Sequence, residues 1–326
     1  MSSILSEGYV AVTHGHEIYY AEFGNPHAPA AVVLHGGPGS SSHVSMLKWF
    51  DLSRWRVVLF DQRGCGKSRP SGSLENNLPD DLIDDIERLR SWLDIDSWVV
   101  VGGSWGAYLG LEYAARHGDV VRHLVLRGVF LPSRLQIDWF FQQLRALVPQ
   151  AWEDLTHGMS EKEKENVLPT LSQRLLGNDT ATIAKSAASW GQYEDVITNV
   201  MLQRGRKQKD ARAADSHLSS QQDETKEKQA AARRIDKFRI QAHYLENLGA
   251  KDRPAILSAL HSISCATTLI HGKHDWICPP ANAVLVQQSL RKAQIRWVEG
   301  GTHTTSDALI CQALSETLAA LAEKAS

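Results

Sequence analysis

The pentapeptide Gly102–Gly106 carries the side chain best suited to nucleophilic chemistry, Ser104, in the order Gly-Gly-Ser-Trp-Gly. It follows the apolar run Trp98–Val101 and precedes a helix-compatible stretch, residues 107–115. A G-x-S-x-G pattern between a strand and a helix forces the serine hydroxyl out over the end of a sheet on a strained turn. Glycine and serine are also ordinary turn residues. The strand and helix around the pattern favour Ser104 as an acyl-transfer nucleophile.

A serine hydroxyl needs an imidazole to take its proton and a carboxylate to fix the tautomer of that imidazole. In one known arrangement the three residues follow the chain order Ser, acid, His. The acid and the histidine then lie in loops after later strands. Asp275 follows the strand-like run Thr267–Ile270, and His303 follows Ile295–Val298. The sequence therefore predicts a Ser104, Asp275, His303 triad. The alternative for His303 is a surface residue in a glycine-rich turn.

His271, His274 and Asp275 also lie close enough in sequence to suggest a metal cluster. We do not favour this interpretation, because no other His or carboxylate completes a ligand set with recognisable spacing. The predicted chemistry requires no metal and no cofactor.

Acyl transfer also needs donors for the oxyanion of the tetrahedral intermediate. Residues 34–40 read Leu-His-Gly-Gly-Pro-Gly-Ser directly after the strand candidate Ala31–Leu34. Glycines at such a place let a backbone N–H point into the site. We predict the N–H groups of Gly37 and of Trp105, the residue after the nucleophile, as the oxyanion donors. The other interpretation of the glycine-rich segment is a plain turn.

Short apolar, β-branched runs separated by turn signals predict the strands that position these residues. The strand candidates are Ile18–Phe23, Ala31–Leu34, Arg56–Phe60, Trp98–Val101, His123–Leu126, Thr267–Ile270 and Ile295–Val298. Between them lie helical patterns such as Pro79–Leu93, whose apolar residues recur with a 3.6-residue period. This alternation predicts an α/β fold with a mostly parallel sheet covered by helices on both faces.

The alternation stops after Val129 and resumes at Thr267. From about residue 131 to residue 260 the sequence is helix-compatible and has no convincing strand. An inserted helical cap explains this most simply. We predict a first core part at residues 1–129, a helical cap at 130–255, and a second core part at 256–326 that holds the acid and the histidine.

The composition excludes several partners. With 326 residues, 43% of them hydrophobic, and a formal net charge of −2, the chain gives no global reason to expect nucleic acid or an anionic membrane as its partner. No stretch approaches the roughly 18 apolar residues of a spanning helix. The polar, basic stretch Gln203–Arg239 is interpreted as a solvated surface, because acids are interspersed and no aromatic residue is positioned for base stacking.

The four cysteines contain no C-x-x-C pair and predict neither a zinc site nor a disulfide scaffold. We expect reduced thiols and a cytoplasmic protein. Cys65 and Cys278 lie in motifs near the predicted site, and the sequence leaves open whether they are reactive or inert and buried. It also leaves the oligomeric state open.

Several segments together resemble the proline iminopeptidases (prolyl aminopeptidases), serine peptidases of the α/β-hydrolase fold, over nearly the whole chain. These are residues 7–9 (Glu-Gly-Tyr), 34–39, 60–68 (Phe-Asp-Gln-Arg-Gly-Cys-Gly-Lys-Ser), 102–106 and 271–275, with Cys278-Pro279. The string Asp-Gln-Arg-Gly-Cys-Gly-x-Ser is more specific to the family than the nucleophile motif. The resemblance implies an α/β-hydrolase fold with an inserted helical cap and removal of an N-terminal proline from a small peptide, without a metal.

In the family that the chain resembles, the cap supplies acidic side chains that hold the amino terminus of the substrate. Residues 189–194, Ser-Trp-Gly-Gln-Tyr-Glu, are similar to a W-x-x-W-E stretch of the family and assign Glu194 to the amine, with Trp190 and Tyr193 beside it. Residues 239–244 are similar to an I-E-x-H-Y stretch, but Gln241 stands where the family has glutamate. The alternative for Glu194 is a surface carboxylate.

Gln241 puts the strictness for proline in doubt, because an amide accepts a hydrogen bond but carries no charge. The candidates for supplying the missing negative charge are Glu246, Asp236 or Glu194 alone. One rival function is a related hydrolase that acts on amino-acid amides, esters or lactones. A second is a non-enzymatic binding protein on the same fold, which the intact triad disfavours.

Overall fold

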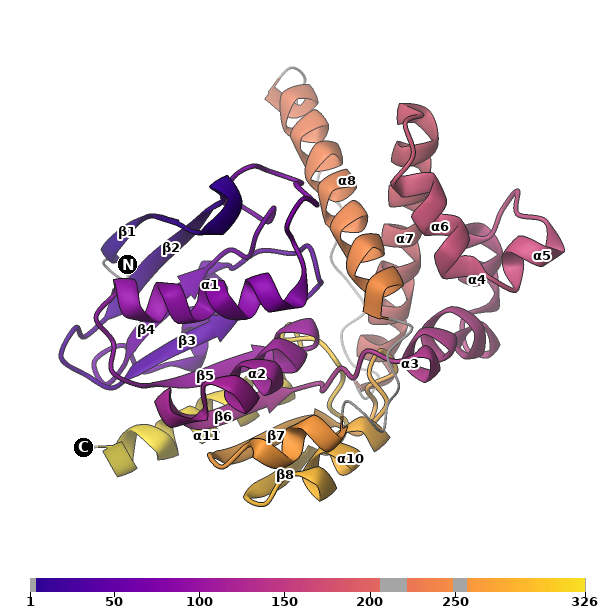
Figure 1. Cartoon of the computed structure of the whole chain (residues 1–326). Helices are drawn as coiled ribbons and strands as arrows, with labels where there is room; N and C mark the ends of the chain where they lie inside the picture. Colours follow the sequence, from indigo (N-terminus) through magenta and orange to yellow (C-terminus); the bar gives the residue numbers. More distant parts are fainter. Residues whose placement is uncertain (1–3, 206–221, 249–256, 326) are drawn as a thin grey trace.

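The centre of the fold is a single eight-stranded sheet in the order β1-β2-β4-β3-β5-β6-β7-β8 (Figure 1). The computed structural model describes residues 4–205, 222–248 and 257–325. The strands are β1 (Ile4–Ala11), β2 (Glu17–Gly24), β3 (Ala30–Leu34), β4 (Arg56–Phe60), β5 (Trp98–Gly103), β6 (Val121–Arg127), β7 (Ala266–Gly272) and β8 (Ala293–Val298). β2 pairs antiparallel with both of its neighbours, β1 and β4. All the other pairs, from β4 to β8, are parallel.

All seven strand candidates from the sequence are strands in the structure, each within about three residues of its predicted bounds. The prediction of a mostly parallel sheet is therefore confirmed. The sequence pattern missed β1, because Ile4–Ala11 alternates poorly and is mostly exposed. Its place in the sheet comes from backbone pairing with β2 rather than from burial of its side chains.

Helices cover both faces of the sheet. On one face lie α1 (Pro79–Trp92), α2 (Trp105–Arg116) and α10 (Ala281–Ser289), which pack into one large apolar cluster with the strands. On the other face lies α11 (Ala308–Ala325), joined by the short 3₁₀ helix Val44–Trp49. β3 and β5 are buried along their whole length between these layers, which explains their continuous apolar runs.

Between β6 and β7 the described residues form helices and no strand. The helices are α3 (Arg134–Asp138), α4 (Pro149–Leu155), α5 (Glu161–Lys164), α6 (Val167–Leu175), α7 (Thr180–Gly205) and α8 (Gln222–Leu248), with a π-helical turn at Trp139–Gln143. Figure 1 shows them gathered on one side of the sheet, past the ends of the strands. Of the basic stretch predicted as a solvated surface, residues 206–221 lie outside the described residues.

Helix α8 connects this helical layer to the sheet layer. Tyr244 donates a hydrogen bond to the side chain of Asn77, and His243 Nε2 lies 3.0 Å from the carbonyl oxygen of the same residue. The ring of Tyr244 also packs on Trp105, with 4.7 Å between the ring centroids. The C-terminal half of α8 is thus fixed directly beside the turn that carries Ser104. Within the described ranges, no helix is long and apolar enough to cross a bilayer.

Candidate active site

Ser104 sits on a strained turn between β5 and α2. Its φ of 57° and ψ of −121° place a non-glycine residue in a region that L-amino acids rarely adopt. Its backbone N–H donates to the carbonyl of Arg127 at 3.0 Å, which ties the turn to β6. Gly106 allows the turn to approach β3, because a Cβ there would lie 2.1 Å from the carbonyl oxygen of Leu34. The hydroxyl is therefore held at the carboxyl end of the sheet.

His303 and Asp275 are brought together by the loops after β8 and β7. His303 Nδ1 lies 2.7 Å from Asp275 Oδ2. The other carboxylate oxygen accepts backbone N–H bonds from Ile277 at 3.0 Å and Cys278 at 2.8 Å. Burial opposes ionisation of Asp275, but His303 and these hydrogen bonds outweigh it, so the pKa of the carboxyl is below its usual range. The carboxylate is charged and fixed in orientation.

A second histidine lies beside the same carboxylate. His271 Nε2 is 2.9 Å from the carbonyl oxygen of Cys278 and 3.5 Å from Asp275 Oδ2. Burial lowers the pKa of His271 below its ordinary value, which makes the neutral ring the stable form. In the described part of the chain, no three His, Cys, Asp or Glu side chains are arranged to hold a metal ion.

Arg127 and Gly128, at the end of β6, support the histidine loop, and sequence reasoning missed both. Arg127 Nη1 donates to the carbonyl oxygen of His303 at 2.6 Å. Gly128 has a φ of 51°, and a Cβ on it would lie 2.9 Å from two atoms of the His303 ring. The imidazole thus lies in a space that only glycine leaves open. A glycine directly after an apolar strand was the available signal, but it does not reveal which side chain needs the space.

The predicted oxyanion donors also lie at the carboxyl end of the sheet, after β3 and β5. Among the described residues, no hydrogen-bond acceptor is found for the backbone N–H of Gly37 or of Trp105. The first N–H groups of a helix lack intrahelical partners, and Trp105 is the first residue of α2. Gly37 has a φ of 121° in the loop after β3. Both groups are therefore available to a ligand oxygen.

Gln62 holds these two donors in a fixed relation, a role that the sequence did not reveal. Its side chain donates to the carbonyl oxygen of His35 at 3.0 Å and accepts from the Trp105 indole N–H at 2.9 Å. Its backbone N–H donates to His35 Nε2 at 3.0 Å. Burial lowers the pKa of His35, so that its ring stays neutral and can accept this bond. Gln62 thus bridges the glycine-rich loop at residues 35–40 (the glycine loop) and α2, the helix that follows Ser104.

The neighbours of Gln62 in the Asp-Gln-Arg-Gly-Cys-Gly string are structural. Asp61 Oδ1 accepts from the backbone N–H and the hydroxyl of Ser42, at 2.7 Å each. The buried guanidinium of Arg63 makes two hydrogen bonds to Asp85, at 2.6 and 2.7 Å. The string therefore fixes the loop after β4 against both the glycine loop and α1.

One cavity collects most of the predicted site residues. Ser104, His303, Gly37, Glu194 and Gln241 all line it. The first three come from the sheet layer, and the last two come from α7 and α8. Asp275 lies behind His303 and is not exposed. The structure thus places the predicted nucleophile, base, one oxyanion donor and amine-binding pair around a single space.

Glu194 is engaged on both carboxylate oxygens. Oε2 lies 2.7 Å from Lys237 Nζ, and Oε1 accepts from Gln241 Nε2 at 2.7 Å. Lys237 lines the same cavity, and sequence reasoning did not single it out. Asp236 instead accepts from Ser71 at 3.0 Å. Asp236 lines the neighbouring groove and not the cavity of Ser104, so it does not supply a second carboxylate there.

Trp190 and Tyr193 lie behind the cavity wall. Both are buried, and neither is among the residues that line the cavities around Ser104. Tyr193 donates to the carbonyl oxygen of Phe140 at 2.9 Å, and Trp190 packs edge-on against Phe141. These two aromatic residues support the π-helical turn whose phenylalanines face the cavity.

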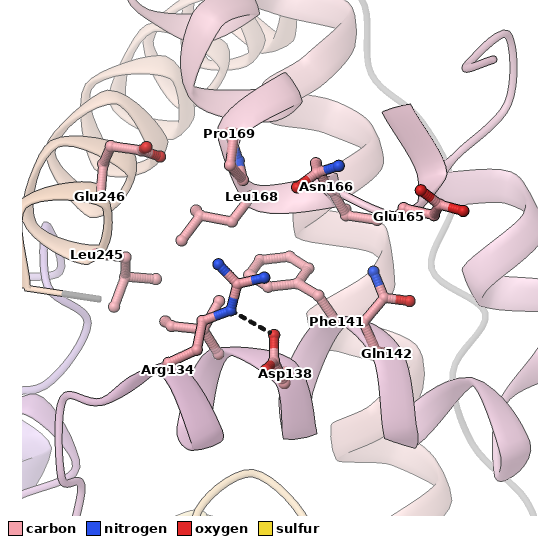
Figure 2. A pocket seen from close by; sticks show the side chains of 12 residues that line it. Arg134, Asp138, Phe141, Gln142, Glu165, Asn166, Leu168, Pro169, Leu245 and Glu246 are labelled. Carbon is pink, nitrogen blue, oxygen red and sulfur yellow. Dashed lines mark hydrogen bonds and ion pairs between the residues drawn. The ribbon is translucent and has the colours of Figure 1, made fainter. Parts of the chain in front are cut away.

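Glu246 lines a second cavity rather than the cavity of Ser104, and these two cavities share no lining residue (Figure 2). Arg134 and Asp138 form an ion pair at 3.0 Å on α3, at its edge. Ile137, Phe141 and Leu245 line both this cavity and a smaller space that reaches Ser104. These three apolar side chains therefore separate the two spaces.

Cys65 and Cys278 are both buried free thiols. Burial raises the pKa of both thiols well above the ordinary value, so neither is a thiolate near neutral pH.

The chain is similar to known hydrolases over nearly its whole length. The family model of the alpha/beta hydrolase fold matches residues 29–305. The probable proline iminopeptidase of Leptolyngbya boryana is 34% identical over 311 residues, which cover 94% of this chain and 91% of that protein. The proline iminopeptidase of Arabidopsis thaliana is 34% identical over 306 residues, 93% of this chain and 76% of that one.

Solved structures agree on the fold. The structure of VinJ matches with a TM-score of 0.66 at 21% identity, covering 99% of this chain and 100% of that chain. The proline iminopeptidase of Mycobacterium smegmatis matches with a TM-score of 0.59 at 20% identity, covering 98% and 97%. The predicted α/β-hydrolase fold is confirmed.

Proposed function

This chain belongs to the proline iminopeptidase family of α/β-hydrolases, and we propose that it releases an N-terminal proline from small peptides through an acyl-enzyme on Ser104. The observation that carries the proposal is the single cavity lined by Ser104, His303 and Glu194. We propose that this cavity combines an acyl-transfer site with a carboxylate that binds the substrate amine. A substrate that reaches both groups is cleaved after its first residue.

The proposed reaction begins with attack of the Ser104 hydroxyl on the carbonyl carbon of the first residue. His303 takes the hydroxyl proton and then gives it to the leaving amine. The 2.7 Å contact of its Nδ1 with Asp275 keeps the proton on that nitrogen and leaves Nε2 as the base. Water then attacks the acyl-enzyme with the same assistance and frees the amino acid.

The oxyanion that forms in each step is proposed to accept hydrogen bonds from the N–H groups of Gly37 and Trp105. Loss of one such donor commonly costs about 3 to 4 kcal/mol of transition-state stabilisation. Gln62 supports both donors through His35 O and the Trp105 indole. The donors are thus set in place before the substrate binds.

At the other end of the cavity, Glu194 is the proposed partner of the substrate amine, and Gln241 offers an amide beside it. Trp190 and Tyr193 are proposed to act indirectly, by holding the π-helical turn that forms the wall. We also propose that α3–α8 are a cap inserted between core parts at residues 1–129 and 256–326. Its role is to supply this amine-binding end.

A second candidate function is hydrolysis of amino-acid amides, esters or lactones by the same machinery. The observation that favours it is the pairing of Glu194 with Lys237, which leaves the amine-binding end with one carboxylate and one ammonium. We place either activity in the cytoplasm, in keeping with four free cysteines in the structure.

Active-site labelling and paired substrates test the proposed function. A fluorophosphonate should label the wild-type protein, and Ser104→Ala should abolish both labelling and turnover. Wild-type protein should release proline from a proline arylamide faster than alanine from the matching alanine arylamide. Mass spectrometry of the labelled peptide locates the modified serine, and initial rates give kcat/KM for each arylamide.

Ser40 provides the matched control, because it also lines the cavity but is not on the nucleophile turn. Ser40→Ala should retain the label. A label that persists in Ser104→Ala excludes Ser104 as the nucleophile. An aryl ester cleaved by orders of magnitude faster than any amide, with no proline release, would replace the peptidase by the second candidate.

A further inference from the structure

The geometry points to Lys237 as a specificity-determining residue. We propose that it neutralises Glu194, so that the cavity accepts an acyl group with no charged amine almost as well as prolyl. The class of additional substrate is an activated ester of a small, uncharged carboxylic acid. The inference rests on the proposed function, because it assumes that Glu194 faces the amine position of the acyl group.

Both oxygens of Glu194 are occupied in the absence of substrate. Lys237 Nζ is 2.7 Å from Oε2, and Gln241 Nε2 is 2.7 Å from Oε1. The side chains of Lys237 and Glu194 are 30% and 21% exposed, so water screens this pair only in part. A substrate ammonium must therefore share or displace a cation that is already in place.

Lys237 is held at this position from two directions. Its Nζ lies 4.5 Å from the centre of the Phe238 ring, a cation–π distance, in addition to the contact with Glu194. Lys237 also lies at the junction of two spaces. It lines the cavity of Ser104 and the groove between the glycine loop and α8. Lys237 thus lines the cavity, and its side chain is also 30% exposed to solvent.

Gln241 adds an uncharged acceptor at the same end. Its amide orientation is fixed, because the opposite one would place Oε1 against the carboxylate of Glu194. Among the described residues, the buried Oε1 has no hydrogen-bond partner, while Gln241 lines both spaces that reach Ser104. An unpaired buried acceptor is costly, so a substrate N–H or O–H that reaches it gains a bond. This gain does not require a charge on the substrate.

The formal charges at this end therefore cancel. Glu194 contributes −1, Lys237 contributes +1 and Gln241 contributes none. The other carboxylate at the site, Asp275, is committed to His303 and two backbone N–H groups. A desolvated ammonium therefore gains little net electrostatic attraction at this end of the cavity. An uncharged ring in its place loses little binding energy.

Two esters that differ only at the amine position test the inference. These are the 4-nitrophenyl esters of L-proline and of cyclopentanecarboxylic acid, which have similar five-membered rings. The readout is the ratio of their kcat/KM values, corrected for spontaneous hydrolysis. We expect a wild-type ratio within about tenfold of one, and a rise of at least about tenfold in Lys237→Met, mainly through KM of the prolyl ester.

Three further variants make the result specific. Lys237→Arg keeps the charge and should keep the low ratio. Lys185→Met removes an exposed lysine on the other helix, α7, and should change nothing. Glu194→Gln in the Lys237→Met background should cancel the rise, because the freed carboxylate is then gone. Thermal unfolding confirms that each variant is folded.

The outcomes separate this inference from the proposed function. An unchanged ratio in Lys237→Met overturns the role of Lys237, as does a wild-type preference for the prolyl ester above about a hundredfold. Hydrolysis of both esters without release of proline from peptides overturns only the peptidase proposal, and the ratio still tests Lys237. A wild-type protein that hydrolyses neither ester overturns both.

Discussion

Gly128 controls how close the end of β6 comes to the imidazole of His303. Its φ of 51° is strained for other residues, and an added Cβ would meet the ring at 2.9 Å. We predict that Gly128→Ala displaces His303 and lowers kcat roughly a hundredfold with little change in KM, because small misplacements of a catalytic group are that costly. Steady-state kinetics on an aryl ester measures the change.

Gly158→Ala is the matched control for Gly128→Ala. Gly158 also has a positive φ, 77°, but nothing lies within 4 Å of the Cβ that would be added. It should show the same backbone strain with normal kcat. Equal losses of kcat in both variants would mean that strain, not contact with His303, is responsible.

The sequence identified the chemical groups of the site more fully than their supports. Ser104, Asp275 and His303 were predicted because each follows a strand-like run in the expected order, and in the structure His303 Nδ1 lies 2.7 Å from Asp275 Oδ2. Gln62, Arg127 and Lys237 were missed, because their roles depend on contacts between distant segments. Gln62 acts on His35 and Trp105, and Lys237 acts on Glu194 one helix away. No local pattern encodes such pairings.

Among the elements, α3, the π-helical turn at Trp139–Gln143 and the end of α8 form a wall between two cavities. These are the second cavity and the smaller space that reaches Ser104, and Ile137, Phe141 and Leu245 separate them. We predict that Leu245→Ala joins the cavities and raises kcat/KM for esters with bulkier acyl chains relative to short ones. The substitution should also cost about 2 to 5 kcal/mol of unfolding free energy, typical of a buried leucine. A series of 4-nitrophenyl esters of increasing chain length measures the shift.

Leu168→Ala tests whether the wall itself matters. Leu168 is buried and lines only the second cavity of the two (Figure 2), so its removal enlarges that cavity and leaves the wall intact. It should destabilise the protein similarly without changing chain-length preference. A parallel shift in both variants would assign the effect to looser packing.

The elements themselves were predictable where burial sets the pattern. β3 and β5 lie between helical layers, and their apolar runs indicated them directly. β1 was missed because its side chains are mostly exposed, and the π-helical turn was missed because its five residues are too few to show a period of their own.

For the whole molecule, Asp275 couples stability to pH. Burial disfavours its charge, but His303 and backbone N–H groups lower its pKa overall. Such a carboxyl contributes stability above its unfolded pKa, about 3.9, and loses that contribution as pH falls through the folded value. We predict that unfolding free energy decreases more steeply from about pH 5 to pH 3 in wild type than in Asp275→Asn.

Urea unfolding followed by tryptophan fluorescence at several pH values measures this difference. Asp275 opposes the burial that lowers the pKa of His271, so the difference between the two curves includes the response of His271 to loss of the carboxylate. Asp154→Asn, at an exposed position, should follow the wild-type curve. Parallel curves for wild type and Asp275→Asn would show that the carboxyl contributes nothing to acid unfolding.

The order of the elements along the chain has a consequence for synthesis. Ser104 precedes the helices between β6 and β7, whereas Asp275 and His303 follow them. A ribosome therefore makes the proposed nucleophile long before its proposed base. Any product of interrupted translation that ends before residue 303 lacks that base, so we expect it to hydrolyse neither peptides nor esters. We expect hydrolysis to begin only after the last strand of the sheet and the loop that carries His303 have been added.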